Sequence, residues 1–274
     1  MAFRGPDAER FLNGQITQDV RLLAGGENSL PSCVTDAKGR LQFRVWITAG
    51  DDGTLWVECP LELAGSLEAR LTRYLIADDV EVTDISGQWS LVHFTGETPD
   101  VPEAVMSRKC SRFRVAGTDW WIPAGQEVAF PGDLPLMQGD AFEAWRISMG
   151  IPLWGNDLIE GLLLPEAGLD ATDVSYHKGC YIGQEVISRM KFAGKVNKRL
   201  RRVMLEKSFN PGNKQLLDQD GNAAGNLTSV SPLLAQNGRP AMAYMKRGIE
   251  RFFATGTDGE LHLVSVLSDF PQTS

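Results

Sequence analysis

The chain has 274 residues, a formal net charge of −8 and 43% hydrophobic residues, values typical of a folded soluble protein. It contains no apolar run of the ~18 residues that a membrane span needs and no secretion signal, so we expect a cytoplasmic protein with no membrane partner. The acidity argues against direct nucleic-acid binding. Four widely spaced cysteines form no CxxC pair, which argues against a disulfide scaffold and against a permanently bound metal.

The first third of the chain predicts an α+β layer, in which a helix covers one face of an antiparallel sheet. Apolar and polar residues alternate from residue 41 to residue 47, and turn residues at 50–53 separate this run from a second one, so a β-hairpin is expected. In chain order, the expected elements are a helix after Asp7, strands over 41–47 and 55–57, an amphipathic helix over 61–76 and a strand region over 80–85.

The middle and the end of the chain differ in pattern. The middle predicts a strand over 89–94, a loop over 96–110, a hairpin over 112–122 that turns at 116–119, and a helix that begins at Asp140 and ends at Gly150. After residue 200, short β-like runs alternate with glycine-rich turns and the helix pattern disappears. This change predicts a small closed sheet or barrel of about 70 residues.

One stretch is strongly basic. Residues 189–202, RMKFAGKVNKRLRR, hold seven lysines and arginines and no acidic residue. Two interpretations stay open: a solvated strand-and-loop face, or, since the rest of the chain is acidic, a site for an anionic ligand or a partner. In the second interpretation, the anion or partner patch consists of Lys198, Arg199, Arg201 and Arg202.

The segment over residues 176–187 combines a cysteine with glycines and a cation. Cys180 lies between Gly179 and Gly183, and a helix pattern begins near the second glycine. Lys178 precedes the cysteine by two residues. A helix N-terminus and a nearby cation both favour the thiolate, so Cys180 is a candidate reactive thiol. The alternative is a buried, inert cysteine in a tight loop. The other three cysteines are expected to be inert: Cys33, Cys59 and Cys110.

Residues 178–185, KGCYIGQE, closely resemble the KGC[FY]xGQE motif of the YgfZ family of folate-binding, iron–sulfur-related proteins. These proteins are relatives of the glycine-cleavage T protein, an aminomethyltransferase. Weaker resemblances extend the match through most of the chain, at residues 5–19, 36–40, 146–157 and 164–169. The eight-residue cysteine motif is the specific signal.

The resemblance implies an aminomethyltransferase-like α+β fold. This fold is a three-domain ring of two ferredoxin-like α+β lobes and a C-terminal β-barrel around a central folate-sized hole. The expected division places residues 1–24 with 105–200 in the first lobe, residues 25–104 in the second lobe and residues 201–274 in the barrel. The barrel agrees with the change in pattern near residue 200.

The resemblance also implies a function: a folate-binding accessory protein that supports assembly or repair of iron–sulfur enzymes, and indirectly tRNA modification. The implied cofactor is tetrahydrofolate or a derivative, and the implied partners are a reduced folate and iron–sulfur enzymes or assembly proteins. The implied catalytic residue is Cys180. The other motif residues are Lys178, Gly179, Tyr181, Gly183, Gln184 and Glu185, and the implied folate-binding residues are Gln15, Thr17, Asp19, Trp154 and Tyr181.

Two departures from the T protein bear on the reaction. The best alignment puts Ser66 at the position of its catalytic aspartate and Ser148 at the position of a pterin-contacting glutamate, and serine cannot act as a carboxylate. Two alternatives nevertheless stay open. A tetrahydrofolate-dependent one-carbon transferase or demethylase needs a carboxylate, for which Asp19, Asp36, Asp157 and Glu166 are candidates. A non-catalytic adaptor would dock a partner through the basic patch.

Overall fold

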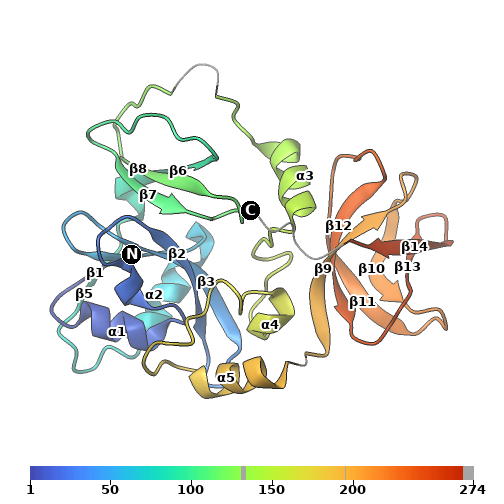
Figure 1. Ribbon diagram of the computed structural model, residues 1–274, viewed down its shortest axis with the longest axis horizontal. Helices are drawn as coiled ribbons and strands as arrows, with labels where there is room; N and C mark the ends of the chain where they lie inside the picture. Colours follow the sequence, from blue (N-terminus) through green and yellow to red (C-terminus); the bar gives the residue numbers. More distant parts are fainter. Residues whose placement is uncertain (131–133, 195, 268–274) are drawn as a thin grey trace. The chain divides into compact units, whose positions relative to one another are not determined.

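The computed structural model describes residues 1–130, 134–194 and 196–267 (Figure 1). The chain forms two compact units. The first comprises residues 1–134 and 170–189, and the second comprises residues 135–169 and 190–274, in each case as far as they are described. Within the described ranges, no helix is long and apolar enough to cross a membrane.

The first unit contains a five-stranded antiparallel sheet with two helices packed on it (Figure 1). The sheet order is β2-β3-β4-β1-β5, and the strands are β1 (Ala2–Arg4), β2 (Ser29–Thr35), β3 (Leu41–Ala49), β4 (Leu55–Glu58) and β5 (Glu81–Thr83). The predicted hairpin is therefore present as β3 and β4. Helices α1 (Ala8–Gln15) and α2 (Ala64–Thr72) bury Leu12 and Leu71 in the same cluster as Ile47 of β3.

Both helices differ from the sequence prediction at their ends. Asp7 holds the N-cap position of α1, but its carboxylate accepts the backbone amide of Asp79 at 2.9 Å instead of an amide of the helix. The helix predicted over 61–76 begins as a 3₁₀ turn, and its α-helical part ends at Thr72. The apolar spacing extends beyond the helix because a following turn keeps Leu75 against the core, while Tyr74 is exposed.

A second sheet of the first unit has the order β6-β8-β7, with β6 (Trp89–Thr95), β7 (Met106–Cys110) and β8 (Gly117–Pro123). The loop predicted over 96–110 and the hairpin turn predicted at 116–119 are wrong, since the hairpin joins β7 to β8 and Cys110 pairs with Gly117. Gly117 lies within a strand and not in a turn. A Cβ there would collide with the carbonyl of Phe94, so close strand packing explains the glycine.

A buried ion-pair network ties the two sheets together. Arg112 donates to both carboxylate oxygens of Glu58 on β4, at 2.6 and 2.8 Å, and to Asp119 on β8, at 3.2 and 2.7 Å. His93 Nδ1 lies 2.7 Å from the same Asp119 carboxylate. Burial opposes ionisation of Asp119, yet His93 and Arg112 lower its pKa. Within the described residues, Asp119 lies near Cys110 and His93, but its oxygens already have partners, so the cluster serves packing.

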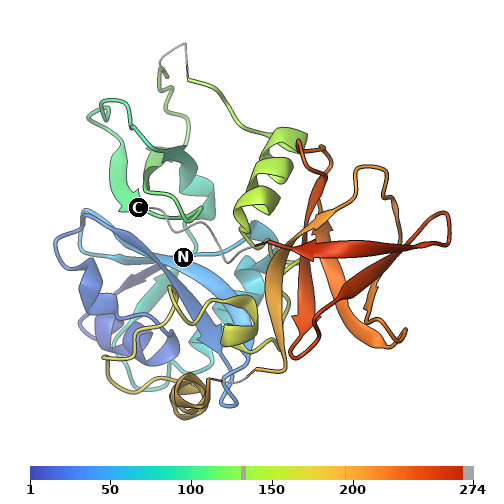
Figure 2. The same cartoon turned by 45° about the vertical axis from the view of Figure 1, so that its right-hand side comes forward.

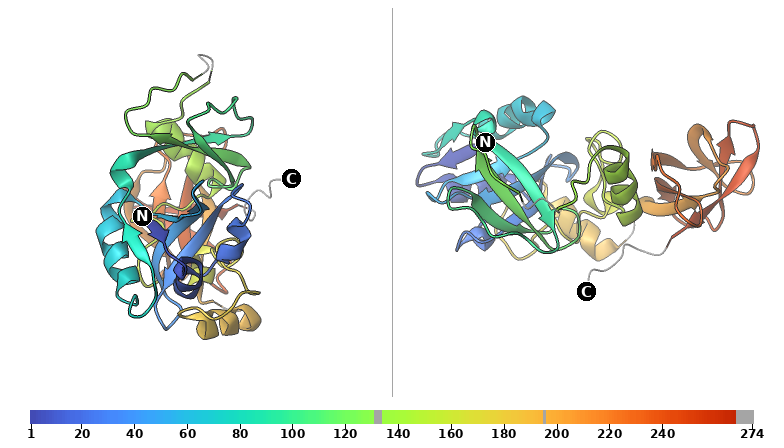
Figure 3. Two further views of the ribbon diagram at one scale, coloured as in Figure 1. Left: turned by 90° about the vertical axis from the view of Figure 1, so that its left-hand side faces the viewer. Right: turned by 90° about the horizontal axis from the view of Figure 1, so that it is seen from above.

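The second unit contains two short helices, α3 (Gly139–Met149) and α4 (Leu164–Ala167), and a closed six-stranded barrel (Figures 2 and 3). The barrel order is β10-β11-β12-β9-β14-β13, and the strands are β9 (Lys198–Leu205), β10 (Pro211–Leu217), β11 (Ala223–Val230), β12 (Arg239–Lys246), β13 (Phe252–Gly256) and β14 (Leu261–Val266). Val203, Leu216 and Ala243 are fully buried inside it. The predicted barrel is confirmed.

The α+β class is confirmed by the sheets, their helices and the C-terminal barrel. Helix α5 (Gln184–Ala193) follows the cysteine motif, where the sequence predicts a helix. The three-domain division at residues 24/25, 104/105 and 200/201 stays a prediction.

Candidate functional site around Cys180

The cysteine motif belongs to a loop that is bonded along its length to α1 and β2 of the first unit. The Ser175 amide donates to the Thr17 carbonyl at 3.0 Å, and the Ile182 amide donates to the Gly14 carbonyl at 3.2 Å. The Thr35 hydroxyl donates to the Ile182 carbonyl at 2.7 Å. These contacts hold both flanks of Cys180, so the loop has a defined backbone.

Two glycines from different motifs meet beneath this loop. Gly183 has φ +88°, and a Cβ on it would lie 2.6 Å from the Asp36 carbonyl and 3.1 Å from the Gly39 Cα. Gly39 has φ +68°, and a Cβ on it would lie 3.1 Å from the Ile187 side chain. Both positions therefore need glycine for conformation and for space. Residues 38–40, which belong to one of the weaker resemblances, therefore pack directly against the cysteine motif.

We expect Gly183→Ala to cost more than about 2 kcal/mol of unfolding free energy, because the left-handed backbone and the Asp36 contact both oppose a side chain. Gly14→Ala is the matched control. Gly14 lies inside α1, and a Cβ there would meet no atom within 4 Å. The control should stabilise the protein by about 0.5–1 kcal/mol. Urea unfolding of both variants measures the difference, and equal stability of the two would contradict the packing argument.

Lys178 points into the protein. Its Nζ donates to the carbonyls of Ile16 and Gln18, at 2.9 and 2.6 Å, and lies 5.1 Å from the centre of the Tyr181 ring. The residue is 7% exposed. Burial lowers the pKa of Lys178 from 10.5 to about 7, although the charge of Asp19 works in the opposite direction. The lysine thus anchors the loop, and its role in favouring the Cys180 thiolate stays a prediction.

The lowered pKa of Lys178 predicts a pH dependence of stability. Below about pH 7 the amine is protonated in the folded and the unfolded chain, whereas between pH 7 and 10.5 the unfolded chain binds more protons. Stability therefore rises with pH in this window, by at most about 1.4 kcal/mol per pH unit. We expect the stability of the wild type relative to Lys178→Met to increase from pH 7 to about pH 9 in urea unfolding. A difference that stays constant would contradict a buried, titrating lysine.

Tyr181 is the buried aromatic residue of the motif. It is 7% exposed, and its hydroxyl has no hydrogen-bond partner. Burial raises the pKa of Tyr181, with a smaller contribution from Tyr176. A buried hydroxyl without a partner costs about 1–3 kcal/mol, which no contact within the described residues offsets.

Cys180 is exposed, in contrast to the other three cysteines. Cys33 and Cys110 are buried and Cys59 is half-buried, and burial raises the pKa of each, to about 11 for Cys59. The alternative of a buried Cys180 is therefore wrong, and the expectation that the other cysteines are inert fits their burial. The catalytic role of Cys180 stays a prediction.

The remaining motif residues have structural partners. Gln184 Nε2 donates to the Gly179 carbonyl at 3.4 Å. Glu185 lies in the first turn of α5 and forms an exposed ion pair of 2.6 Å with Arg189. An acid at this position complements the helix dipole, which is a sufficient reason for its presence.

Three of the predicted folate-binding residues lie beside the loop, and their side chains are engaged. Gln15 accepts from Arg70 at 3.2 Å, and Thr17 donates to the Asp173 carbonyl at 2.6 Å. The hydrogen bonds from Arg21 lower the pKa of Asp19. Trp154 belongs to the second unit and is half-buried. Direct contact of any of these residues with folate stays a prediction.

A second polar centre lies within the second unit. Arg146, which is 1% exposed, donates to the Asp157 carboxylate at 2.9 Å and to both oxygens of Glu143, at 2.7 and 2.6 Å. Asp157 is completely buried and also accepts from Ser229 of β11 at 2.8 Å and from the Leu153 amide at 3.0 Å. This network joins α3 and the segment after it to the barrel.

Comparison with known proteins identifies relatives in sequence and in fold. No family model matches the chain. It is 28% identical over 217 residues to the tRNA-modifying protein YgfZ of Klebsiella pneumoniae, and 28% identical over 220 residues to the mitochondrial iron-sulfur cluster assembly factor IBA57 homolog of Neurospora crassa. The matches cover 71% and 72% of this chain. The chain therefore spans less than two thirds of these relatives, at 65% and 49% of their lengths.

In structure, the chain matches the glycine cleavage system aminomethyltransferase T of Bartonella henselae. The TM-score is 0.78 at 17% identity, and the match covers 98% of this chain and 82% of that one. The chain is a relative of the YgfZ and IBA57 proteins with an aminomethyltransferase fold. The predicted resemblance and the predicted fold are both confirmed by these matches.

A polar centre that the sequence did not predict lies beneath the loop of this YgfZ relative. Asp173 is completely buried, accepts from Arg44 Nε at 2.7 Å and lies 4.0 Å from the Cys33 sulfur. Arg44 lies on the polar face of the predicted hairpin strand, which sequence alternation assigns to solvent. Trp46, two residues later on the same face, is buried and its ring centre lies 5.7 Å from the Arg44 guanidinium, and this tryptophan was the available signal that the face is covered.

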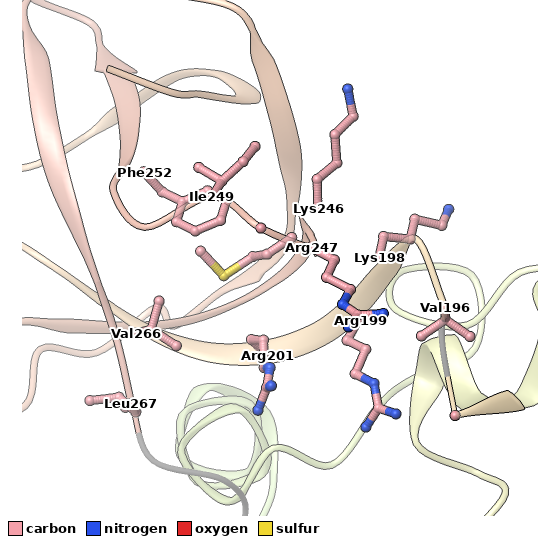
Figure 4. Close-up of a pocket in the computed structure, with 13 residues that line it drawn as sticks. Val196, Lys198, Arg199, Arg201, Lys246, Arg247, Ile249, Phe252, Val266 and Leu267 are labelled. Carbon is pink, nitrogen blue, oxygen red and sulfur yellow. The ribbon is translucent and has the colours of Figure 1, made fainter. Parts of the chain in front are cut away.

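All four residues of the basic patch lie on β9. Lys198, Arg199 and Arg201 line one cavity, whose lining does not include Arg202 (Figure 4). The side chain of Arg202 is half-buried, its Nε has no partner, and burial lowers its pKa. The joint role of these four residues as an anion or partner patch stays a prediction, and Lys195 lies outside the described residues.

Proposed function

We propose that this protein is a cytoplasmic accessory factor for iron–sulfur cluster assembly or repair that acts through Cys180 and a reduced folate, and that it supports tRNA modification indirectly. The observation that carries the proposal is an exposed thiol on a loop whose flanks are held by buried bonds. The names of the YgfZ and IBA57 relatives give the proposal its biological context.

The Cys180 thiol has three open chemical roles: transient ligation of iron or a cluster, redox exchange, or attack on a one-carbon adduct of folate. A cluster needs several ligands, and Cys180 is the single exposed cysteine within the described ranges, which include all four cysteines. Ligation therefore needs a further thiol from elsewhere. This requirement favours an iron–sulfur enzyme or an assembly protein as the partner.

The alternative of a folate-dependent transferase or demethylase needs a free carboxylate, and the four candidates have structural partners. Asp19 pairs with Arg21, and Asp157 pairs with Arg146. Asp36 accepts two backbone amides of its own turn, both at 2.9 Å, and Glu166 accepts the Leu163 amide at 3.2 Å. These bonds support the accessory role over the transferase.

Serine occupies the two positions where the T protein has a catalytic aspartate and a pterin-contacting glutamate, and neither serine is placed for acid–base chemistry. Ser148 donates to the Ala144 carbonyl at 2.8 Å, one turn earlier in α3, and Ser66 is exposed on α2. Neither position offers the carboxylate that aminomethyl transfer uses. This again favours an accessory role.

A reduced folate fits the loop in one respect. The hydroxyl of Tyr181 is buried and has no partner among the described residues, so a movement of the loop that uncovered it would offer a folate a hydrogen-bonding group. Folate would supply one-carbon chemistry when bound, and Tyr181 would hold it by a hydrogen bond.

Folate binding is tested with Tyr181→Phe in a tetrahydrofolate titration followed by tryptophan fluorescence. We expect the variant to bind at least about fivefold more weakly, because a hydrogen bond to the ligand is lost. The unfolding free energy should stay equal or rise, because the substitution removes a buried hydroxyl without a partner. Unchanged affinity would remove Tyr181 from the folate site, and absence of binding in the wild type would overturn the folate part of the proposal.

The accessory function is tested by reconstitution. An iron–sulfur enzyme lacking its cluster is incubated with ferrous iron and a sulfide donor, with and without this protein. We expect faster recovery of client activity with the protein present. Identical recovery in both samples would overturn the proposed function.

A further inference from the structure

A cavity of about 610 Å³ lies at one end of the barrel and is lined by second-unit residues (Figure 4). Five cationic residues line it: Lys198, Arg199, Arg201, Lys246 and Arg247. No aspartate or glutamate occurs among those lining residues that belong to the described ranges. In a chain of net charge −8, such a concentration of positive charge is a local feature and not a consequence of composition.

The register of two barrel strands brings these cations together. Lys198 on β9 pairs directly with Lys246 on β12, and Arg199 pairs with Met245. Like charges directly opposite in an antiparallel pair destabilise the sheet, so close approach of the two ammonium groups is unfavourable. The two lysines diverge: Lys246 Nζ donates to the Ala223 carbonyl at 2.7 Å, and Lys198 Nζ lies 4.9 Å from the Tyr244 ring centre.

Two of the arginines have no carboxylate partner within the described part of the chain. Arg199 and Arg247 are exposed, and neither forms an ion pair with a residue of the described ranges. Figure 4 labels both arginines among the residues that line the cavity. The guanidinium groups of both arginines can therefore donate paired N–H hydrogen bonds to phosphate or carboxylate oxygens.

The wall of the cavity is apolar. Met245 and Phe252 are buried members of the barrel core, and Ile249 and Val266 lie beside them. The mouth of a small barrel is a common ligand site, and a volume between about 300 and 1,000 Å³ fits a small molecule. The cavity thus combines cationic side chains with an apolar wall.

We infer that this barrel cavity binds a small organic polyanion, with two or more phosphate or carboxylate groups held by the arginines and lysines and an apolar or planar part against Met245 and Phe252. The inference goes beyond the proposed function, because no residue of the Cys180 loop takes part. It also assigns a role to the basic segment and adds Lys246 and Arg247, which the sequence pattern did not include.

The inference is tested by calorimetric titration of the full chain with two probes, ATP for phosphates and tri-γ-glutamate for carboxylates. We expect saturable one-to-one binding of at least one probe, weakened at least about fivefold when NaCl rises from about 50 to about 300 mM. The probe that binds more tightly identifies the anionic group. Cys180→Ser should bind it as the wild type does.

Matched charge variants locate the site. Arg199→Glu/Arg247→Glu should weaken binding at least about tenfold, whereas Lys207→Glu/Lys214→Glu, with the same change in net charge on exposed residues outside the cavity, should stay within about twofold. If the glutamate variant shows no thermal unfolding transition and is therefore not folded, Arg199→Ala/Arg247→Ala replaces it in the binding measurement. The inference is overturned by the absence of saturable binding of both probes, by equal weakening in both pairs, or by binding that is lost in Cys180→Ser.

Discussion

Replacement of Cys180 by serine is expected to lower the recovery of an iron–sulfur client at least about tenfold in the reconstitution assay, with an unchanged unfolding transition. Cys180 carries the one exposed thiol among the four cysteines, all of which lie in the described part of the chain. Serine keeps the size of the side chain, but its hydroxyl neither ligates iron as a thiolate does nor undergoes redox exchange. Because the side chain is exposed, stability should change by less than about 0.5 kcal/mol.

Two variants separate the Cys180 hypothesis from the adaptor alternative. Cys59→Ser is the matched control, because Cys59 is half-buried and its pKa is raised to about 11, so recovery should be unaffected. Charge reversal of the patch, Arg199→Glu/Arg201→Glu/Arg202→Glu, tests docking. Full recovery with Cys180→Ser and its loss in the charge-reversed variant would favour the adaptor, and the reverse order favours thiol chemistry.

Sequence patterns predicted the elements that depend on local periodicity. Strand alternation gave the β3–β4 hairpin, and the change of pattern near residue 200 gave the barrel. They failed where glycine has a packing role instead of a turn role, as at Gly117, which appears in a turn-like sequence but lies within β8. A close approach to the Phe94 carbonyl is a property of the sheet and leaves no local signal.

The candidate site could be predicted only in part for a similar reason. The motif identified Cys180, and the structure shows that it is exposed. The partners beneath it come from distant segments: Lys178 contacts the carbonyls of Ile16 and Gln18, about 160 residues away, and Asp173 contacts Arg44. Such pairs depend on tertiary contacts, which a single sequence does not contain. The polar face of β3 therefore appeared to be a solvated one.

The buried ion pair of the second unit predicts the largest change in stability. Asp157→Ala removes the acceptor of Arg146, Ser229 and the Leu153 amide together, and Arg146 is 1% exposed. Glu143 still pairs with Arg146 in this variant, but the lost buried ion pair and the donors of Ser229 and Leu153 left without an acceptor together cost about 3–5 kcal/mol. We expect a loss of this size in urea unfolding, followed with a spectroscopic probe in the barrel. The probe belongs there because the chain has two units, which need not unfold in a single transition.

Two control variants test whether the pairing of Arg146 determines this loss of stability. Glu143 also pairs with Arg146 but its side chain is 35% exposed, so Glu143→Ala should cost less than about 1 kcal/mol. The double variant Arg146→Met/Asp157→Leu removes both charges and should recover much of the loss seen in Asp157→Ala, because the buried charge no longer lacks a partner. If the double variant is less stable than Asp157→Ala, then the hydrogen bonds to Ser229 and Leu153, and not the unpaired arginine, dominate the energetics of this centre.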